Sequence, residues 1–291
     1  MFSKKLNEQL IELGLDPENV EKIISETIAE DLVGGEDVTS NSIIPEEQNS
    51  IAEFVARKPG VVAGLHIAAA VLEFEGITNY EILVSEGSHI DGDRTLLRAR
   101  GNTRKLLLTE RTALNFLGRL SGIATLTNRW VSEVKGSDTK IRDTRKTTPL
   151  LREFEKFAVR TGGGINHRMS LSDAALIKDN HVLAAGGVAA AFEAVKKKHP
   201  NIPMEVEVDS LEQLKEVVAA GAELILLDNM SLEQCRAAVE IVEGRCKLEA
   251  SGGLTLENAH AYAKTGVDYL AVGALTHSAP VLDIGLDLRM E

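Results

Sequence analysis

Side chains that bind anions gather in one stretch of the sequence, from Thr144 to His181. Around the triple glycine 162–164, this stretch holds Arg145, Lys146, His167, Arg168 and Lys178. Guanidinium groups bind carboxylates and phosphates through paired hydrogen bonds, whereas ammonium groups act as point charges. Glycine lets the backbone come close to a ligand, which favours substrate contact by the neighbouring His167. The stretch therefore predicts an anion-binding active site.

The local charge supports this interpretation. Between Lys140 and His181 the chain has nine Lys and Arg residues against five Asp and Glu, a local charge of +4. The whole chain carries −12, so the remainder sums to −16. Such a positive focus concentrates a small anion, while the acidic surround repels nucleic acid. Arg152, Lys156 and Arg160 follow helical spacing beside acids, and we expect them on a solvated helix face instead.

Composition limits the class of protein. The 291 residues, 44% apolar and 26% charged, predict an ordinary globular protein of one large or two moderate domains. The apolar runs are too short to span a bilayer, and the N-terminus lacks the apolar segment of a secretory signal. Two cysteines, Cys235 and Cys246, give no disulfide framework and suit a reducing compartment. We therefore expect a cytoplasmic protein with no membrane partner.

Short strands and helices alternate irregularly in the first part of the chain, which predicts an α+β layer. Two helices are expected between Leu6 and Leu32, separated at Asp16-Pro17. The next expected elements are strands 50–57, 80–84 and 95–99, a helix at Leu65–Phe74, and a long helix from Asn102 or Thr103 to Val134. Gly118 and Gly122 interrupt the long helix, so it can be drawn as one helix or two.

From Lys140 onward, six apolar runs alternate with helical segments, as in βα units. The runs are KIRD, AALIK, MEVEV, LILLD, KLEA and DYLAVG. Polar or small residues end them: Asp143, Lys178, Glu207 with Asp209, Asp228, Ser251 and Gly273. Because a β/α barrel carries its active site at the carboxyl ends of its strands, these residues are expected to converge there.

Side-chain alternation refines this prediction. In MEVEVD it places Glu205, Glu207 and Asp209 on one face of the strand, and the apolar residues on the face that packs against helices. The acids then face the barrel lumen, where Asp228 and Lys178 join them if their faces are also lumenal. A purely structural ion-pair network is the alternative, because buried acids need partners in either case.

Two glycine loops follow the last two strands of the series. Ser251-Gly252-Gly253 leads into a helix capped by Thr255, and Val272-Gly273-Ala274 leads into a short helical turn. Exposed backbone N–H groups at such helix starts form the phosphate site of many barrels, although each glycine pair alone is compatible with simple turn chemistry. The residues thus predict a barrel enzyme that acts on a phosphorylated, multiply anionic small molecule.

Several motifs resemble those of the carboxylating quinolinate phosphoribosyltransferases, the nicotinate-nucleotide pyrophosphorylase family of NAD biosynthesis. They are TRKT, GGGINHR with LIKDNH, EVEVDS, LLDNMS, EASGGL and VDYLAVGALTHSAP, together with EDLVGGEDVTS, KPGVVAG and ERTALNFLGRLSGIATLT earlier in the chain. The resemblance implies an α/β protein: an N-terminal α/β sandwich domain (1–115) and an incomplete, open β/α barrel (116–291) whose last residues can return to the first domain. It also implies a homodimer in which the N-terminal domain covers the partner's barrel mouth.

The resemblance assigns roles to individual residues. Arg111 is expected to reach the partner's site, and Arg145, His167, Arg168 and Lys178 are expected to hold the pyridine dicarboxylate. Lys146, Glu207 and Asp228 face phosphoribosyl pyrophosphate, and with Lys178 they form the expected catalytic set. The ribose 5-phosphate is expected to bind to the two glycine loops, at Ser251, Gly252, Gly253, Val272, Gly273 and Ala274. Thr144 completes the expected substrate-binding set. The implied cofactor is Mg²⁺, mostly on the pyrophosphate, with Glu207 and Asp228 as protein ligands; no organic cofactor is implied.

The chemistry of the two substrates is compatible with these roles. Two rival functions remain open. Adjacent carboxylates on quinolinate suit two arginines, and acids near the ribose stabilise positive charge as pyrophosphate leaves. A lysine that ends a barrel strand also fits a Schiff-base aldolase, with Lys178 as the nucleophile. A related phosphoribosyltransferase that uses nicotinate is the second rival, and a non-catalytic or metal-linked homologue that keeps the fold is a further alternative.

Some positions depart from the family pattern or stay outside the predicted site. Leu150 stands where Gly is usual, Gly118 where Gln is common, and Ala271 and Gly285 where Ser is usual. Among the other histidines, we expect His66, His89 and His199 on the surface. His277 is ambiguous and is left out of the predicted site.

Overall fold

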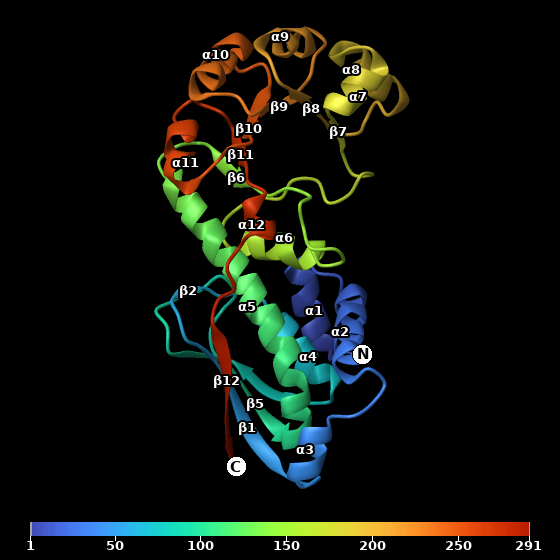
Figure 1. Cartoon of the computed structure of the whole chain (residues 1–291), viewed down its shortest axis with the longest axis vertical. Helices are drawn as coiled ribbons and strands as arrows, with labels where there is room; N and C mark the ends of the chain where they lie inside the picture. Colours follow the sequence, from blue (N-terminus) through green and yellow to red (C-terminus); the bar gives the residue numbers. More distant parts are fainter. Residues whose placement is uncertain (1, 291) are drawn as a thin grey trace. The chain divides into compact units, whose positions relative to one another are not determined.

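A computed structural model describes residues 2–290 and divides the chain into two compact units (Figure 1). Unit 1 contains the chain up to Leu126, Thr148–Gly162, and the segment from Ala279 onward; unit 2 contains Thr127–Thr147 and Gly163–Ser278. The predicted domain boundary, between residues 115 and 116, and the division after Leu126 both fall within one helix, α5 (Thr103–Glu133).

Unit 1 is built on a four-stranded antiparallel sheet with strand order β12-β1-β5-β3. Its strands are β1 (Asn49–Ala56), β3 (Asn79–Ile82), β5 (Arg94–Asn102) and β12 (Ile284–Met290), and a separate pair joins β2 (Gly60–Val61) to β4 (His89–Ile90). Its helices are α1 (Lys4–Glu12), α2 (Pro17–Leu32), α3 (Val38–Ile43), α4 (Leu65–Phe74), α6 (Arg152–Thr161) and most of α5.

Sequence patterns located most of these elements. The break at Asp16-Pro17 is confirmed, since Asp16 caps α2 through its side chain and Pro17 occupies the first helical position. The helix at Leu65–Phe74 is confirmed as α4, and the three predicted strands correspond to β1, β3 and β5. Helix α3 and the short β2–β4 pair were not predicted from sequence patterns.

The long helix α5 is a single helix, so the option of two helices is wrong. Its glycines are sites of close approach between backbones rather than helix breaks. A Cβ on Gly122 would lie 2.0 Å from the carbonyl oxygen of Pro280, and the amide of Leu282 donates a hydrogen bond of 2.9 Å to the carbonyl of Gly118. The chain leading to β12 therefore crosses α5 where the helix carries no side chain.

Unit 2 contains a six-stranded sheet whose neighbouring strands are all parallel, in the order β6-β11-β10-β9-β8-β7. The six predicted runs form these strands: β6 (Lys140–Arg142), β7 (Ala175–Ile177), β8 (Met204–Val208), β9 (Leu224–Asp228), β10 (Lys247–Ser251) and β11 (Tyr269–Ala271). The helices are α7 (Asp179–Ala185), α8 (Val188–Lys198), α9 (Leu211–Ala219), α10 (Leu232–Val242), α11 (Leu256–Ala263) and α12 (Ala274–His277).

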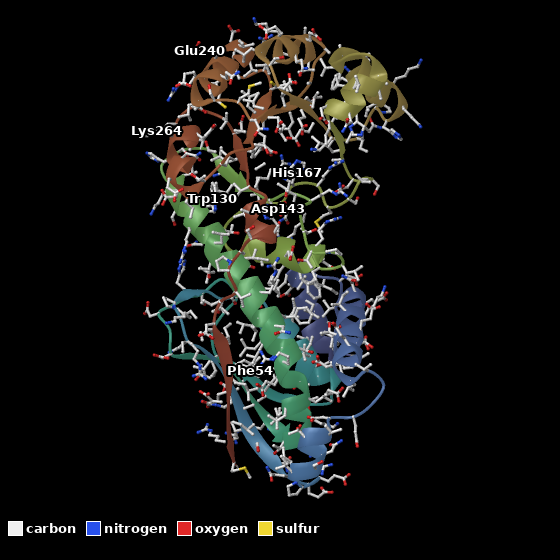
Figure 2. The ribbon with its side chains drawn as sticks, in the orientation of Figure 1. Phe54, Trp130, Asp143, His167, Glu240 and Lys264 are labelled. Atoms are coloured by element: carbon white, nitrogen blue, oxygen red, sulfur yellow. The ribbon has the colours of Figure 1, made fainter. Side chains whose placement is uncertain are left out.

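The sheet curves like part of a barrel but does not close. Helices α8 to α11 follow one face of it (Figure 1), where Glu240 and Lys264 are exposed on the outer sides of α10 and α11 (Figure 2). Among the described strands, β6 and β7 are not paired with each other. Residues 148–162, the middle part of the connection between these two strands, belong to unit 1. The predicted fold class is thus confirmed as α/β, with an open β/α barrel and an N-terminal α/β domain.

The surface prediction for Lys156 is wrong. Lys156 was expected on a solvated helix face, but its side chain is fully buried in unit 1, next to the buried carboxylate of Glu155. That carboxylate accepts hydrogen bonds from Arg119 Nη2 at 2.7 Å and from Thr148 Oγ1 at 2.7 Å. Helical spacing alone cannot distinguish a solvated face from one covered by a distant segment, because both satisfy the i,i+4 pattern.

Among residues 2–290, no helix is both long and apolar enough to cross a membrane.

Candidate active site

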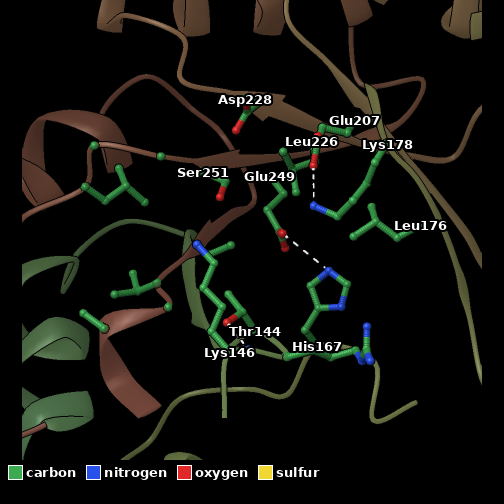
Figure 3. Close-up of a pocket in the computed structure, with 18 of the residues that line it drawn as sticks. Thr144, Lys146, His167, Leu176, Lys178, Glu207, Leu226, Asp228, Glu249 and Ser251 are labelled. Carbon is green, nitrogen blue, oxygen red and sulfur yellow. Dashed lines mark hydrogen bonds and ion pairs between the residues drawn. The ribbon is translucent and has the colours of Figure 1, made fainter. Parts of the chain in front are cut away.

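A cavity of about 730 Å³ opens at the carboxyl ends of the unit 2 strands (Figure 3). Every site residue predicted from the sequence lines it except Arg111, which is exposed on α5 in unit 1. The lining set is Thr144, Arg145, Lys146, His167, Arg168, Lys178, Glu207, Asp228, Ser251, Gly252, Gly253, Val272, Gly273 and Ala274. Its position agrees with the general rule for barrel enzymes.

Two arginines in the connection between β6 and β7 are close enough for their charges to interact. Arg145 comes after β6, and Arg168 comes after the glycine loop that precedes β7. Burial lowers the pKa of Arg168, and the neighbouring positive charge of Arg145 lowers it further. Arg168 Nη1 donates a 2.9 Å hydrogen bond to the carbonyl of Ala174, which fixes one side of the guanidinium. Two cations held close together favour a ligand that carries more than one negative charge.

Lys178 and Glu207 form an ion pair across the mouth of the cavity. The Nζ atom of Lys178 lies 3.0 Å from Oε2 of Glu207, and the side chains are 47% and 14% exposed (Figure 3). Strands β7 and β8 are neighbours, so their adjacent ends bring the two charges together. Both side chains are accessible enough to exchange this pairing for contacts with a charged ligand.

Asp228 ends β9, and Asn229 orients it. The Nδ2 atom of Asn229 donates a 2.9 Å hydrogen bond to Oδ2 of Asp228. The backbone amide of Asn229 donates a 2.8 Å hydrogen bond to the carbonyl of Ser251. Asn229 has φ +52°, a left-handed conformation that Asn tolerates better than most residues. A Cβ on Gly252 would lie 2.1 Å from Oδ1 of Asn229, so glycine there leaves room for this amide.

The two glycine loops have the predicted helix starts. Thr255 caps α11 through a capping box with Asn258, and α12 follows Gly273 directly. A Cβ on Gly273 would lie 2.9 Å from Cδ of Lys146 and 3.2 Å from Nε2 of His277. Both side chains therefore come close to this backbone, and His277, which was left out of the prediction, lines the cavity.

A second missed group lies at the deep end of the cavity. His167 is 8% exposed, and its Nε2 lies 2.7 Å from Oε2 of Glu205 and 3.6 Å from Oε1 of Glu249. Arg142 Nη1 lies 2.8 Å from Oε2 of Glu249. Glu205 was expected on the lumenal face of β8 with Glu207, whereas Glu249 was missed, although alternation places it on the same face of β10 as Ser251.

The two buried acids interact unfavourably with each other. Burial raises the pKa of Glu249 to about 7, with a further contribution from the charge of Glu205. Burial also raises the pKa of Glu205, against the opposing effect of Arg142. Two carboxyl groups in one desolvated site resist simultaneous ionisation.

Two other predicted strand ends lie outside the cavity lining. Asp209 is exposed, with its amide bonded to the side chain of Gln213. Asp143 is fully buried and lies close to His167 (Figure 2). Its carboxylate accepts a 2.7 Å hydrogen bond from the amide of His167 and a 2.6 Å hydrogen bond from Nδ2 of Asn166.

The surface predictions for the other histidines are confirmed in part. His66 was wrongly placed on the surface, because its side chain is largely buried and lies 3.1 Å from the carboxylate of Glu86. His89 and His199 are exposed as predicted.

Sequence and structure comparisons agree on one family. The chain matches the descriptions "Quinolinate phosphoribosyl transferase, N-terminal domain" over residues 37–121 and "Quinolinate phosphoribosyl transferase, C-terminal domain" over residues 123–287. A nicotinate-nucleotide pyrophosphorylase (carboxylating) from Mycobacterium leprae (strain TN) is 51% identical over 271 residues, covering 91% of this chain and 95% of the relative.

Further relatives extend this similarity to solved structures. A probable nicotinate-nucleotide pyrophosphorylase (carboxylating) from Bacillus subtilis (strain 168) is 41% identical over 278 residues, covering 93% of this chain and 94% of the relative. The crystal structure of NadC from Streptococcus pyogenes is 38% identical, with a TM-score of 0.91 over 95% of this chain and 99% of that one.

Proposed function

Because the chain belongs to the quinolinate phosphoribosyltransferase family, we propose that the unit 2 cavity is where it transfers phosphoribosyl from phosphoribosyl pyrophosphate to quinolinate. The products are nicotinate mononucleotide, pyrophosphate and CO₂, which makes the chain a pentosyltransferase of NAD biosynthesis. The observation that carries the location is the gathering of four cations and two strand-end acids, with two glycine loops, in a single cavity.

Quinolinate is assigned to the arginine side of the cavity. Its two adjacent carboxylates match the guanidinium groups of Arg145 and Arg168, which can each bind a carboxylate in parallel. Lys178 supplies a third cation once a ligand displaces its pairing with Glu207. His167 completes this wall of the cavity. A planar dicarboxylate bound this way presents its ring nitrogen to the ribose.

Phosphoribosyl pyrophosphate is assigned to the remaining residues. Ser251, Gly252 and Gly253, together with Val272, Gly273 and Ala274, offer backbone N–H groups near helix starts for the 5-phosphate. Glu207 and Asp228 would hold the ribose hydroxyls and stabilise positive charge at C1, while Lys146 would neutralise the leaving pyrophosphate. Thr144 accepts a 3.0 Å hydrogen bond from the Lys146 amide and orients that turn.

The chemical step follows from this arrangement. The C1–O bond to pyrophosphate breaks with its electron pair on the oxygen, and the pyridine nitrogen forms the new bond to C1. The C2–carboxylate bond then breaks to release CO₂, because the N-alkylated ring accepts the electron pair, and C2 takes up a proton. The proposal includes Mg²⁺, which would neutralise charge on the pyrophosphate when bound. The carboxylates of Glu207 and Asp228 are hard oxygen ligands suited to that ion.

A direct assay tests this function. The purified protein should release CO₂ and pyrophosphate from quinolinate and phosphoribosyl pyrophosphate, and only when Mg²⁺ is present. Use of nicotinate without CO₂ release would move the chain to a related transferase. A borohydride-stable adduct on Lys178 with a phosphorylated aldehyde would instead support the aldolase, which the 47% exposed, paired lysine does not favour.

The proposal also includes a cytoplasmic homodimer with shared active sites. It rests on the family resemblance, the exposure of Arg111 on α5 and the two free cysteines. Arg111→Ala and Arg145→Ala should each lose most of their activity at quinolinate concentrations below saturation. After the two variants are mixed and allowed to exchange subunits, up to about a quarter of wild-type activity should return, because half the dimers are hybrids with one intact site. No recovery despite exchange would place Arg111 outside the partner's site.

A further inference from the structure

Four charged or titratable side chains form a buried cluster below the cavity, and the proposed function assigns no chemistry to three of them. The cluster consists of Arg142 on β6, His167 in the following loop, Glu205 on β8 and Glu249 on β10. Glu205 is 3% exposed and Glu249 is not exposed. Figure 3 shows His167 and Glu249 pointing toward each other beneath Lys178 and Glu207.

His167 is held from two sides. On the loop side, its backbone amide donates to Asp143, and its Nδ1 accepts a 2.7 Å hydrogen bond from the amide of Arg168. On the sheet side, Nε2 faces the two acids, at 2.7 Å from Glu205 and 3.6 Å from Glu249. Because Nδ1 accepts this hydrogen bond, it matches the tautomer that carries its proton on Nε2. Both ring nitrogens therefore face protein groups.

Arg142 anchors the acids in turn. Its Nη1 lies 2.8 Å from Glu249 and 4.0 Å from Glu205, and its guanidinium carbon lies 5.0 Å from the ring centre of Tyr269. A guanidinium placed between two carboxylates and against an aromatic face has little freedom to move. The cluster thus connects strands β6, β8 and β10 beneath the cavity.

A metal ion fits this cluster poorly. Tetrahedral ligands about 2.0–2.1 Å from zinc lie roughly 3.3 Å apart, whereas His167 and Glu205 approach within 2.7 Å. Arg142 already supplies a positive charge to the acids, and Arg145 and Arg168 lie in the same unit. A divalent ion would add charge to an already cationic cavity.

We propose that Glu205 and Glu249 are positioning residues for quinolinate, which act by holding His167 and Arg142 in place below the cavity. His167 then serves as a fixed, neutral wall rather than a cation that binds a carboxylate. The carboxylates are left to Arg145, Arg168 and Lys178. This inference rests on the proposed function of the cavity.

The reaction gives such a wall a purpose. The pyridine nitrogen must keep its lone pair free to attack C1, and an imidazolium beside it would compete for that lone pair. A neutral imidazole whose Nε2 faces the buried acids does not compete. A side chain locked by its outer partners also places the ring accurately, and loss of such partners commonly costs a site about 10-fold to 100-fold.

Glu205→Gln and Glu249→Gln test the proposal. Each should weaken the binding of quinolinate alone, measured by calorimetry, by about 10-fold or more. The KM for phosphoribosyl pyrophosphate should stay within about two-fold, since the glycine loops are untouched. Asp209→Asn is the matched control, because this exposed acid directly follows β8 but lies outside the cavity lining, and it should change neither constant.

The alternatives give different results. A merely structural role would lower the melting temperature without separating the two substrates, and equal losses for both substrates would overturn the proposal. Unchanged quinolinate affinity in a folded Glu249→Gln variant would also overturn it. If neither amide variant folds, Glu205→Asp can be used, because its shorter side chain keeps the negative charge but moves it away from His167. This variant should also weaken quinolinate binding while leaving the KM for phosphoribosyl pyrophosphate unchanged.

A measurement on the wild-type protein avoids substitutions altogether. Nitrogen-15 spectra of histidine-labelled protein should show His167 as the neutral tautomer with its proton on Nε2, and an imidazolium would overturn the proposal. If the wild type binds quinolinate but releases no CO₂, the proposed function fails. The calorimetric comparison would still test the positioning role on its own.

Discussion

In the proposed function, individual cations divide the cavity between two anionic substrates, and substitutions should reveal this division. Arg145→Ala or Arg168→Ala should weaken quinolinate binding by roughly 10-fold to 100-fold, since each removes a charge-assisted interaction worth about 1.5–3 kcal/mol. Binding of phosphoribosyl pyrophosphate should be nearly unchanged. Calorimetry with each substrate alone measures both affinities. Lys146→Ala should instead weaken the binding of phosphoribosyl pyrophosphate and leave the binding of quinolinate nearly unchanged. Equal losses for both substrates would contradict the division of roles.

Asn229 contributes to the site through its conformation and its amide, and two variants separate these contributions. Asn229→Gly keeps the left-handed conformation but loses the hydrogen bond to Asp228. It should keep its stability and raise the KM for phosphoribosyl pyrophosphate about 3-fold to 10-fold, as expected for one hydrogen bond. Asn229→Ala should add a stability loss of about 1 kcal/mol. Steady-state kinetics and urea unfolding would measure both effects; a normal KM in Asn229→Gly would remove the positioning role.

At the scale of elements, helix α5 packs closely against the chain leading to β12 at Gly122. Ala is the better helix former by about 1 kcal/mol, but its Cβ would overlap the carbonyl oxygen of Pro280. Overpacking of this kind costs about 1–3 kcal/mol, so Gly122→Ala should lower the free energy of unfolding. Gly118→Ala should be milder, because its nearest neighbour is the movable side chain of Val281. Urea unfolding of both variants checks the order, and a stabilised Gly122→Ala would contradict it.

The loop after β6 contains a strained residue, Leu150. It has φ +67° and is 74% exposed, so it pays the cost of a left-handed conformation without burying its side chain. That cost, about 1–2 kcal/mol, exceeds the entropic penalty of glycine, about 0.5–1 kcal/mol. Leu150→Gly should therefore stabilise the protein by up to about 1 kcal/mol. Leu171→Gly, at an exposed residue without positive φ, should not stabilise it, and a reversed order in urea unfolding would contradict the strain.

Elements with a clear local pattern were predictable from the sequence, and elements fixed by distant partners were not. The six parallel strands follow from apolar runs that end in chemically active residues, which also located Lys178, Glu207 and Asp228. Strand β12 exists because it pairs with β1, more than two hundred residues earlier. The burial of Lys156 likewise depends on packing within unit 1 that a helical repeat does not encode.

The site itself was predictable where a residue ends a strand and less so inside one. Glu249 lies two residues before Ser251, and side-chain alternation would have placed it on the same face. A buried acid in mid-strand is unusual unless a partner satisfies it, and that partner, Arg142, comes from a different strand. Only the strand order, which places β11 between β6 and β10, brings the two side chains within reach.

At the scale of the whole molecule, the buried acids should make stability depend on pH. The pKa of Glu249 rises from its ordinary 4.5 to about 7, chiefly through burial, so the folded state binds this proton more strongly than the unfolded state does. Its contribution to stability is therefore greatest below pH 4.5 and is lost as pH rises toward 7. A shift of this size corresponds to roughly 3 kcal/mol. Glu205, whose pKa is also raised by burial, acts in the same direction.

Urea unfolding of the wild type and Glu249→Gln at pH 5 and pH 8 would measure this dependence. The wild type should be less stable at pH 8 than at pH 5, and the variant should lose much of that difference because its amide does not titrate. Asp37 and Asp287, whose pKa values are lowered by their hydrogen bonds, act in the opposite direction but titrate below this window. They therefore cannot produce a decline between pH 5 and pH 8. An equal decline in both proteins would show that Glu249 is not its source.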